Sequence, residues 1–210
     1  MNHRSGEPDV GELRRRLREQ RRGLDLDAQR RRADAVAARG FGVPEIAAAR
    51  TVGTYLPDDG EVDPTPLTEK LDQRGAALHL PVVGGDDLLR FRSWDLRSAL
   101  VEGRWGIAVP DEPSETRSTD ELDVVIVPLV AADPRGTRIG RGVGYYDRAL
   151  AHRLELDGRP LIVGYAHHFQ LVDATLPRQP WDVPLDVLVT EQRVLRFTDG
   201  DSGSGPVRVP

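Results

Sequence analysis

Cysteine is absent from the 210-residue sequence, and lysine occurs once, as Lys70. The lack of cysteine excludes disulfide bonds, thiolate nucleophiles, and zinc or iron–sulfur sites with cysteine ligands. The near-absence of lysine restricts how a phosphate group can be bound. Arginine side chains, backbone N–H groups, a metal ion or that single lysine must hold it.

Long apolar segments are also missing. The longest, from Val124 to Ala132, is nine residues, whereas a membrane helix needs about 20. The first residues, MNHRSGEPDVGELRRR, contain no apolar segment of the kind found in secretory signal peptides. The net charge of −5 argues against a general nucleic-acid binder. We therefore expect a cytoplasmic protein that binds neither nucleic acid nor membrane.

Strand-like and helix-like segments alternate along the chain. Periodicity and composition predict helices over residues 11–39, with a break near Asp25 and Asp27, and over 63–74 and 145–156. Short β-rich segments predict strands at 51–56, 76–81, 122–130, 161–165 and 187–190. This order predicts one three-layer α/β/α domain over residues 10–198, with a mostly parallel sheet. Residues 1–9 and 199–210 are expected to be flexible.

Two features are interpreted as structural. Acidic residues interrupt the arginines of the first helix, and no aromatic residues lie between them, so we interpret them as a solvated helix face. His167 and His168 are adjacent, and neighbouring residues of a strand point to opposite faces, so they cannot bind one metal ion from a strand. We expect both histidines in a loop or at the rim of a site.

The segment 133–148, DPRGTRIGRGVGYYDR, carries the clearest chemical signal. It follows the most apolar predicted strand and leads into a helix, which is where open α/β sheets bind ligands. Gly140, Gly142 and Gly144 allow the backbone to approach a ligand and to direct its N–H groups inward. The dinucleotide fingerprint fails because Tyr145 stands at its sixth position, and no Gly-Lys pair exists for a P-loop.

Charged residues in this segment favour a phosphate ligand. Arg138 and Arg141 provide bidentate cationic donors, and the N-terminus of the following helix adds partial positive charge. Asp147, in the first turn of that helix, could hold a divalent ion against phosphate oxygens. The alternative is a structural loop with three turn glycines.

The string VPLVAADPRGTRIGRGVGYYDR resembles the signature of the 5-formyltetrahydrofolate cyclo-ligase family, also called methenyltetrahydrofolate synthetase. The resemblance covers residues 10–191. Other matching segments follow in the family's order: Tyr55-Leu56, Glu61 to Asp63, Leu80-Pro81, Trp105 to Ile107 before Pro110, Gln170 to Asp173, Leu176-Pro177, Asp182-Val183 and Asp186 to Glu191.

The resemblance implies a ligase that uses ATP and Mg²⁺ to convert 5-formyltetrahydrofolate into 5,10-methenyltetrahydrofolate, with release of ADP and phosphate. It places ATP against Arg14, Arg138, Ile139, Gly140, Arg141, Gly142, Val143, Gly144, Tyr145 and Tyr146. It places the reduced folate against Leu56, Glu61, Trp105, Arg141, Gly142, Val143, Gly144 and Tyr145. It assigns Mg²⁺ to Asp147 and Asp182, and it requires no covalent or acid–base catalytic residue. We expect a monomer.

Four residues depart from the family pattern, among them Trp181, where a histidine commonly precedes the metal aspartate, and Ala132, where a phenylalanine is usual. Val10 stands where a lysine is usual, and Val143 where glycine or lysine is frequent. One alternative function is therefore a degenerate member that binds nucleotide or folate without turnover. Another is a different enzyme on a related scaffold, such as a sugar-phosphate isomerase, which would need no ATP. Two assignments also have structural alternatives, because Asp182 could cap a turn and Trp105 could belong to the core.

Overall fold

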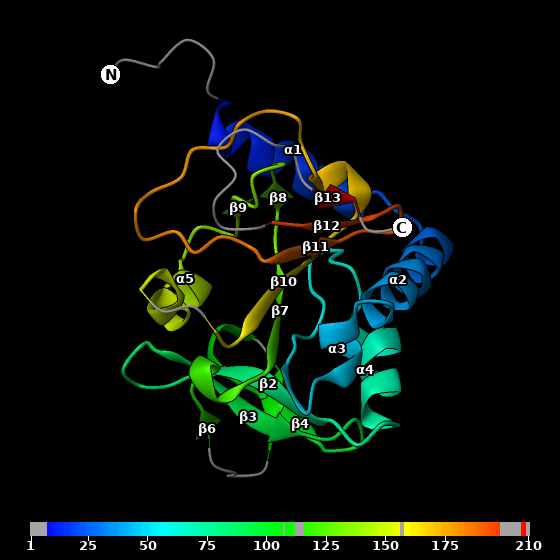
Figure 1. Cartoon of the computed structure of the whole chain (residues 1–210), viewed down its shortest axis with the longest axis vertical. Helices are drawn as coiled ribbons and strands as arrows, with labels where there is room; N and C mark the ends of the chain where they lie inside the picture. Colours follow the sequence, from blue (N-terminus) through cyan, green and yellow to red (C-terminus); the bar gives the residue numbers. More distant parts are fainter. Residues whose placement is uncertain (1–7, 107, 112–115, 156–157, 198–206, 209–210) are drawn as a thin grey trace.

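The computed structural model describes residues 8–106, 108–111, 116–155, 158–197 and 207–208. Nine strands form the main sheet, in the order β13-β12-β11-β10-β7-β1-β2-β3-β6 (Figure 1). Their bounds are β1 Thr51–Gly53, β2 Ala77–Val83, β3 Leu89–Trp94, β6 Thr116–Arg117, β7 Val124–Pro128, β10 Leu161–Tyr165, β11 Val187–Val189, β12 Val194–Arg196 and β13 Val207–Arg208. Two hairpins lie outside it, β4 Leu100–Glu102 with β5 Ala108–Pro110, and β8 Ala131–Ala132 with β9 Arg138–Ile139.

The five central strands, β11, β10, β7, β1 and β2, are all parallel. Antiparallel strands extend the sheet at both edges: β12 and β13 beside β11, and β3 and β6 beside β2. The predicted single α/β domain with a mostly parallel sheet is therefore confirmed. The antiparallel edge strands were not predicted from the sequence, and one of them, β13, lies within the terminal segment expected to be flexible.

Helices and short 3-10 turns connect the strands. The helices are α1 Val10–Arg22, α2 Leu26–Phe41, α3 Pro44–Ala48, α4 Thr65–Asp72 and α5 Tyr145–Ala149. The 3-10 turns are η1 Arg104–Gly106, η2 Thr119–Glu121, η3 Ala151–Leu154 and η4 His168–Gln170. The predicted break near Asp25 is confirmed, because its carboxylate accepts a hydrogen bond from the Ala28 N–H at 2.6 Å and caps α2. No helix of the described chain is long and apolar enough to cross a membrane.

Strand β7 is buried on both faces, as its uninterrupted apolar sequence predicts. Val124 and Ile126 pack into a core shared with α2, α3 and α4. Val125 and Val127 face the opposite way, into a second core to which α5 contributes. Figure 1 shows α2, α3 and α4 on one side of the sheet and α5 on the other. These two cores define the three layers.

Helix α1 lies at the carboxyl end of β7. Its Leu13 and Leu17 are buried against Val130, Ala131 and Ile139, in the chain that leaves β7. This packing brings the arginine-rich helix next to the segment that the sequence singles out. The fold therefore assembles α1, the end of β7 and the glycine-rich segment at one edge of the sheet.

Candidate active site

The candidate site is built around the glycine loop, which we define as residues Gly140–Gly144. Strand β7 ends at Pro128, the β8–β9 hairpin follows, and the glycine loop connects β9 to α5. The loop therefore lies beyond the carboxyl end of a central parallel strand. Open α/β sheets bind their ligands at this edge.

Two of the loop glycines are required by backbone geometry. Gly142 has a φ of 107° and Gly144 a φ of 73°, a region that other residues rarely adopt. A Cβ atom at Gly142 would meet no atom closer than 3.8 Å, the guanidinium carbon of Arg14. The chain thus needs glycine at position 142 for its φ angle, since space for a side chain is available.

The backbone of the glycine loop is arranged to accept an anion. Its carbonyls are partly occupied: Arg14 Nε donates to Gly140 O at 3.0 Å, and Arg148 Nη1 donates to Val143 O at 2.8 Å. Within the described residues, none of the five N–H groups of residues 140–144 donates to a protein acceptor. Successive N–H groups without a protein acceptor, next to guanidinium groups, are the kind of donors that bind phosphate.

The helix that follows the glycine loop is shorter than predicted. Helix α5 ends at Ala149, and residues 151–154 form the 3-10 turn η3 in place of a helix continuing to residue 156. The chain turns inward at Leu150, which is fully buried. Five residues give only a small helix dipole, so the anion site rests on the loop N–H groups and the arginines.

A second segment, the acidic turn, faces the glycine loop; we define it as residues Asp58–Glu61. Arg141 connects the two, with Nη1 2.7 Å from Asp58 Oδ2 and Nη2 3.0 Å from Glu61 Oε1. The other Glu61 carboxylate oxygen accepts from the Asp58 N–H at 3.2 Å. The fold therefore brings together two of the residues that the sequence assigned to one site, Glu61 and Arg141.

Glu61 is a buried carboxylate, with 8% of its surface exposed. Burial raises its pKa, and the positive charges of Arg141 and Arg21 oppose that rise. Tyr146 also lies close enough to respond, because burial and the charge of Glu61 both raise the pKa of its phenol. Between the loop and the turn, the buried Glu61 carboxylate is therefore paired with the Arg141 guanidinium.

Arg21 fixes the acidic turn and is fully buried, so the interpretation of the α1 arginines as a solvated face is wrong at this position. Its Nε donates to Asp59 O at 2.9 Å, its Nη2 to Asp59 Oδ2 at 2.6 Å, and its Nη1 to Leu129 O at 3.2 Å. Nη1 also lies 3.7 Å from Glu61 Oε1. One guanidinium thus joins α1, the end of β7 and the acidic turn.

Asp59 is the centre of this cluster. Burial opposes its ionisation, but hydrogen bonds from Arg18, Arg22 and Arg21 hold the pKa of its carboxyl well below the usual range. Its backbone has a φ of 57°, which aspartate tolerates better than most residues. The sequence showed only a turn at Pro57 to Gly60. An arginine on the buried stripe of α1, four residues after Leu17, was the available signal for Arg21.

The candidate metal ligands lie on neighbouring segments. Asp147 Oδ1 accepts from Arg138 Nη2 at 2.6 Å and from the Val183 N–H at 3.3 Å, so α5 contacts the residue directly after Asp182. Asp182 Oδ2 accepts from the Gln179 N–H at 2.7 Å and closes a turn, as its structural alternative predicts. The second oxygen of each carboxylate, Asp147 Oδ2 and Asp182 Oδ1, takes no part in these hydrogen bonds.

The donor set is small. In the described parts of the chain, no group of three or more His, Asp or Glu side chains could hold a metal ion. Magnesium is commonly bound by one or two carboxylates, with water and phosphate oxygens completing its octahedral shell. In number, Asp147 and Asp182 match an ion of that kind, and two carboxylates are too few for a metal site made of protein ligands alone.

The remaining predicted residues occupy varied positions. Ile139 is buried in the core beneath α1, and Leu56 packs partly against the sheet core. Tyr145 lies half-buried in α5, with the Arg148 guanidinium 4.9 Å from its ring centre. Val143 is 58% exposed at the tip of the loop. The structure does not describe the side chain of Trp105.

His167 lies in a loop, as expected, but it is fully buried and does not line a rim. Its Nε2–H donates to Gly60 O at 3.0 Å, which supports the backbone of the acidic turn. Burial lowers the pKa of His167 to about 4, so the ring is neutral at physiological pH. His167 is therefore a structural support that the sequence did not reveal.

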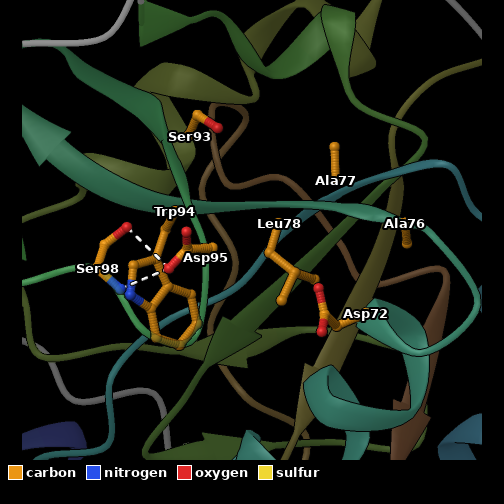
Figure 2. A pocket seen from close by; sticks show the side chains of 8 residues that line it. All are labelled: Asp72, Ala76, Ala77, Leu78, Ser93, Trp94, Asp95 and Ser98. Atoms are coloured by element: carbon orange, nitrogen blue, oxygen red, sulfur yellow. Dashed lines mark hydrogen bonds between the residues drawn. The ribbon is translucent and has the colours of Figure 1, made fainter. Parts of the chain in front are cut away.

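A cavity of about 240 Å³ lies elsewhere, at the start of β2 and the end of β3. Figure 2 shows its lining residues: Asp72, Ala76, Ala77, Leu78, Ser93, Trp94, Asp95 and Ser98. Ala77 is the first residue of a parallel strand, so the cavity lies at the amino edge of the sheet, away from the glycine loop. None of the predicted site residues whose side chains the structure describes lines it.

The fold and the site define a class: single-domain α/β proteins with an arginine-flanked glycine loop at the carboxyl edge of the sheet. Residues 7–191 match the model of the 5-formyltetrahydrofolate cyclo-ligase family. The 5-formyltetrahydrofolate cyclo-ligase of Escherichia coli K12 is 38% identical over 182 residues, which cover 85% of this chain and 98% of that protein. That of Mycolicibacterium smegmatis is 32% identical over 168 residues, 78% of this chain and 84% of its own.

Solved structures agree with these relatives. The NMR structure of Aquifex aeolicus 5,10-methenyltetrahydrofolate synthetase aligns with a TM-score of 0.77 and 36% identity, covering 92% of this chain and 95% of that one. The Mycoplasma pneumoniae synthetase, at 24% identity and a TM-score of 0.69 over 88% of this chain and 99% of its own, supports the fold. The chain belongs to the 5-formyltetrahydrofolate cyclo-ligase family.

Proposed function

We propose that this protein catalyses the ATP-dependent cyclisation of 5-formyltetrahydrofolate to 5,10-methenyltetrahydrofolate, with release of ADP and phosphate. The observation that carries the ATP requirement is the glycine loop. Its five N–H groups have no acceptor in the described protein, while arginines hold two of its carbonyls. A substrate without phosphate would leave these donors unused.

The loop and its arginines suit phosphoryl transfer. This reaction asks the protein mainly to position the phosphates and to neutralise their charge. The free N–H groups would bind phosphate oxygens, and Arg14 and Arg141 would supply positive charge. Phosphorylation of the formyl oxygen would activate its carbon for attack by N10, and phosphate would then leave. No residue with a depressed nucleophile pKa is needed for these steps.

Arg14 accounts for the departure at Val10. Both residues belong to α1, and Arg14 already lies against Gly140 of the loop, at 3.0 Å. Arg15 points to Glu12, and Arg18 to Asp59, so neither is directed at the loop. Arg14 is thus the α1 cation placed to take over a lost lysine contact.

The acidic turn would receive the folate. Glu61 lies beside Arg141 and can accept hydrogen bonds from the pterin or from the N10 region. Leu56 and Tyr145 would add apolar contacts, and Trp105 would stack on the pterin. Asp147 and Asp182 would hold Mg²⁺, which would supply charge neutralisation at the phosphates. Cytoplasmic location and a monomeric state stay predictions.

Absorbance of the methenyl product tests the proposal directly. The purified protein is mixed with 5-formyltetrahydrofolate, with and without ATP and Mg²⁺, and the product band is followed. We expect product only when all components are present. Binding of ATP or folate without product would favour a degenerate binder. Failure to bind either ligand would favour an unrelated reaction on this scaffold.

A further inference from the structure

Trp181 stands at the tip of a closed turn near the glycine loop. The Asp182 N–H donates to Gln179 O at 3.0 Å, and the Gln179 N–H donates to Asp182 Oδ2 at 2.7 Å. Pro180 occupies the second position of this four-residue turn, where its fixed φ favours the turn. The backbone that carries Trp181 is therefore held by two hydrogen bonds and a proline.

The Trp181 side chain is 65% exposed. Among the described side chains, the other large exposed apolar residues are all aliphatic: Leu26, Leu88, Leu100, Val101, Val143 and Leu154. Single exposed apolar residues are ordinary on protein surfaces. Whether this exposed indole has a function therefore depends on which segments its turn contacts.

The turn is attached to the site by its next residues. The Val183 N–H donates to Asp147 Oδ1 at 3.3 Å, and the Leu185 N–H donates to Gly136 O at 2.9 Å. Asp147 itself is three residues beyond the glycine loop, whose tip carries Val143, 58% exposed. Two exposed apolar side chains thus lie on the two segments that meet at Asp147.

We infer that the Trp181 indole stacks on the base of the nucleotide whose phosphates the glycine loop holds. The inference rests on the proposed function, because it needs a nucleotide at that loop. The acidic turn contacts the loop through Arg141, whereas the Trp181 turn contacts α5 through Asp147. On this proposal the folate would lie on the Arg141 side of the loop, and the nucleotide base on the Asp147 side, to which the Trp181 turn is attached.

If the indole stacks on the base, Trp181 contributes to the affinity for ATP and not to the affinity for a ligand that lacks a base. A base gains about ten-fold in affinity from an aromatic platform, equivalent to about 1.4 kcal/mol. Inorganic tripolyphosphate carries the charges of ATP and no base. Trp181→Ala should therefore weaken ATP binding about ten-fold and leave tripolyphosphate binding unchanged. Trp181→Phe keeps a ring and should recover most of the ATP affinity.

Tryptophan fluorescence provides a readout independent of turnover. ATP is titrated without folate, and the Trp181→Phe signal, which contains only Trp94 and Trp105, is subtracted. We expect ATP, and not tripolyphosphate, to quench the Trp181 component. This measurement uses the wild type and the phenylalanine variant, so it holds even if the alanine variant folds poorly. Leu26→Ala, which removes an equally exposed residue of α2, should bind both ligands normally.

The outcomes separate the inference from the function on which it rests. Equal ATP affinity of wild type and Trp181→Ala, with no quenching, would overturn the inference and leave the proposed function intact. Loss of folate affinity alone in Trp181→Ala would also overturn it and assign the indole to the pterin. A wild-type protein that binds neither ATP nor tripolyphosphate would overturn both.

Discussion

The acidic turn and the glycine loop face each other but are built in opposite ways. The acidic turn buries the side chains of Asp59 and Glu61, and the Asp59 carboxylate meets three arginines of α1. The glycine loop is largely exposed, has two residues at positive φ, and leaves its N–H groups without protein acceptors in the described chain. The side-chain charges of one half are paired within the protein, whereas the N–H groups of the other half are left for the ligand that we propose.

The charges show why the halves differ. Arg21 has its donors committed to Asp59 and Leu129 and is fully buried, so a phosphate would have to break a desolvated network to reach it. Arg141 is half-exposed, and its pairs with Asp58 and Glu61 are partly open to water. The pair with the exposed Asp58 contributes little and can exchange for a phosphate. The Arg141 side chain can therefore exchange its Asp58 partner in the acidic turn for a phosphate at the glycine loop.

The largest expected effect comes from removing the buried guanidinium. Arg21→Met leaves Asp59 and Leu129 O without their buried donors. Breaking a buried ion pair from one side costs about 3–5 kcal/mol. We expect a loss of that size in the free energy of unfolding, measured by urea titration. Arg16→Met, an exposed change on the same helix, should stay within about 0.5 kcal/mol. A loss below about 1 kcal/mol for Arg21→Met would mean that the turn does not depend on it.

The two carboxylates of the acidic turn should give opposite pH dependence. The pKa of Asp59 is lowered by folding, so its stabilisation is present above its usual value of 3.8 and lost as pH falls toward the folded pKa. The difference in unfolding free energy between wild type and Asp59→Asn, about 1.5–3 kcal/mol near neutral pH, should therefore shrink below pH 4. Curves that stay parallel down to pH 2 would contradict this.

For Glu61 the sign is reversed. Folding raises its pKa above 4.5, so the folded state binds its proton more tightly than the unfolded state. Wild type should gain stability relative to Glu61→Gln as pH falls through the folded pKa toward 4.5. Turnover of folate should suffer much more in Glu61→Gln than ATP affinity. Equal loss of both, or wild-type kinetics, would remove Glu61 from the folate half.

Arg14 tests the cation supply of the glycine loop. Arg14→Ala removes a hydrogen bond to a loop carbonyl and a charge beside the phosphates. A contact of this kind is worth about 1.5–3 kcal/mol, or about one to two orders of magnitude in ATP affinity. Val10→Lys should tighten ATP binding little, because Arg14 already compensates. Calorimetric titration with ATP measures both, and a large gain from Val10→Lys would show that no arginine has taken over.

The smallest expected effect concerns the loop backbone. Gly142→Ala places a side chain at a φ of 107° where space is open, so its cost is conformational, about 1–2 kcal/mol. We expect this cost to appear as weaker ATP binding. Gly75→Ala is a matched control, because Gly75 has a φ of 81° and open space but follows α4. Gly75→Ala should lower the stability by a similar amount and leave the ATP affinity unchanged. An equal loss of ATP affinity in Gly75→Ala and Gly142→Ala would show that the loop does not bind ATP.

The sequence predicted the glycine loop better than the acidic turn, for a physical reason. Glycines and an apolar strand are local signals, and β7 and β10 formed where the composition placed them. The role of Arg21 depends on contacts with residues 38 and 108 positions away, which no local pattern encodes. The same holds for His167 and Gly60, 107 positions apart. In β3, alternation of Leu89 and Phe91 with arginines carried a strand signal that the sequence analysis did not use.

Backbone hydrogen exchange with and without ATP tests the central claim, that the acidic turn is complete in the free protein and the glycine loop is completed by phosphate. In the free protein, the N–H groups of Asp58 and Glu61 donate to protein acceptors, while those of residues 140–144 do not. We predict slow exchange at Asp58 and Glu61 in both states, and fast exchange across residues 140–144 that slows when ATP binds. Fast exchange of the acidic turn in the free protein, or a glycine loop that ATP leaves unprotected, would contradict the account.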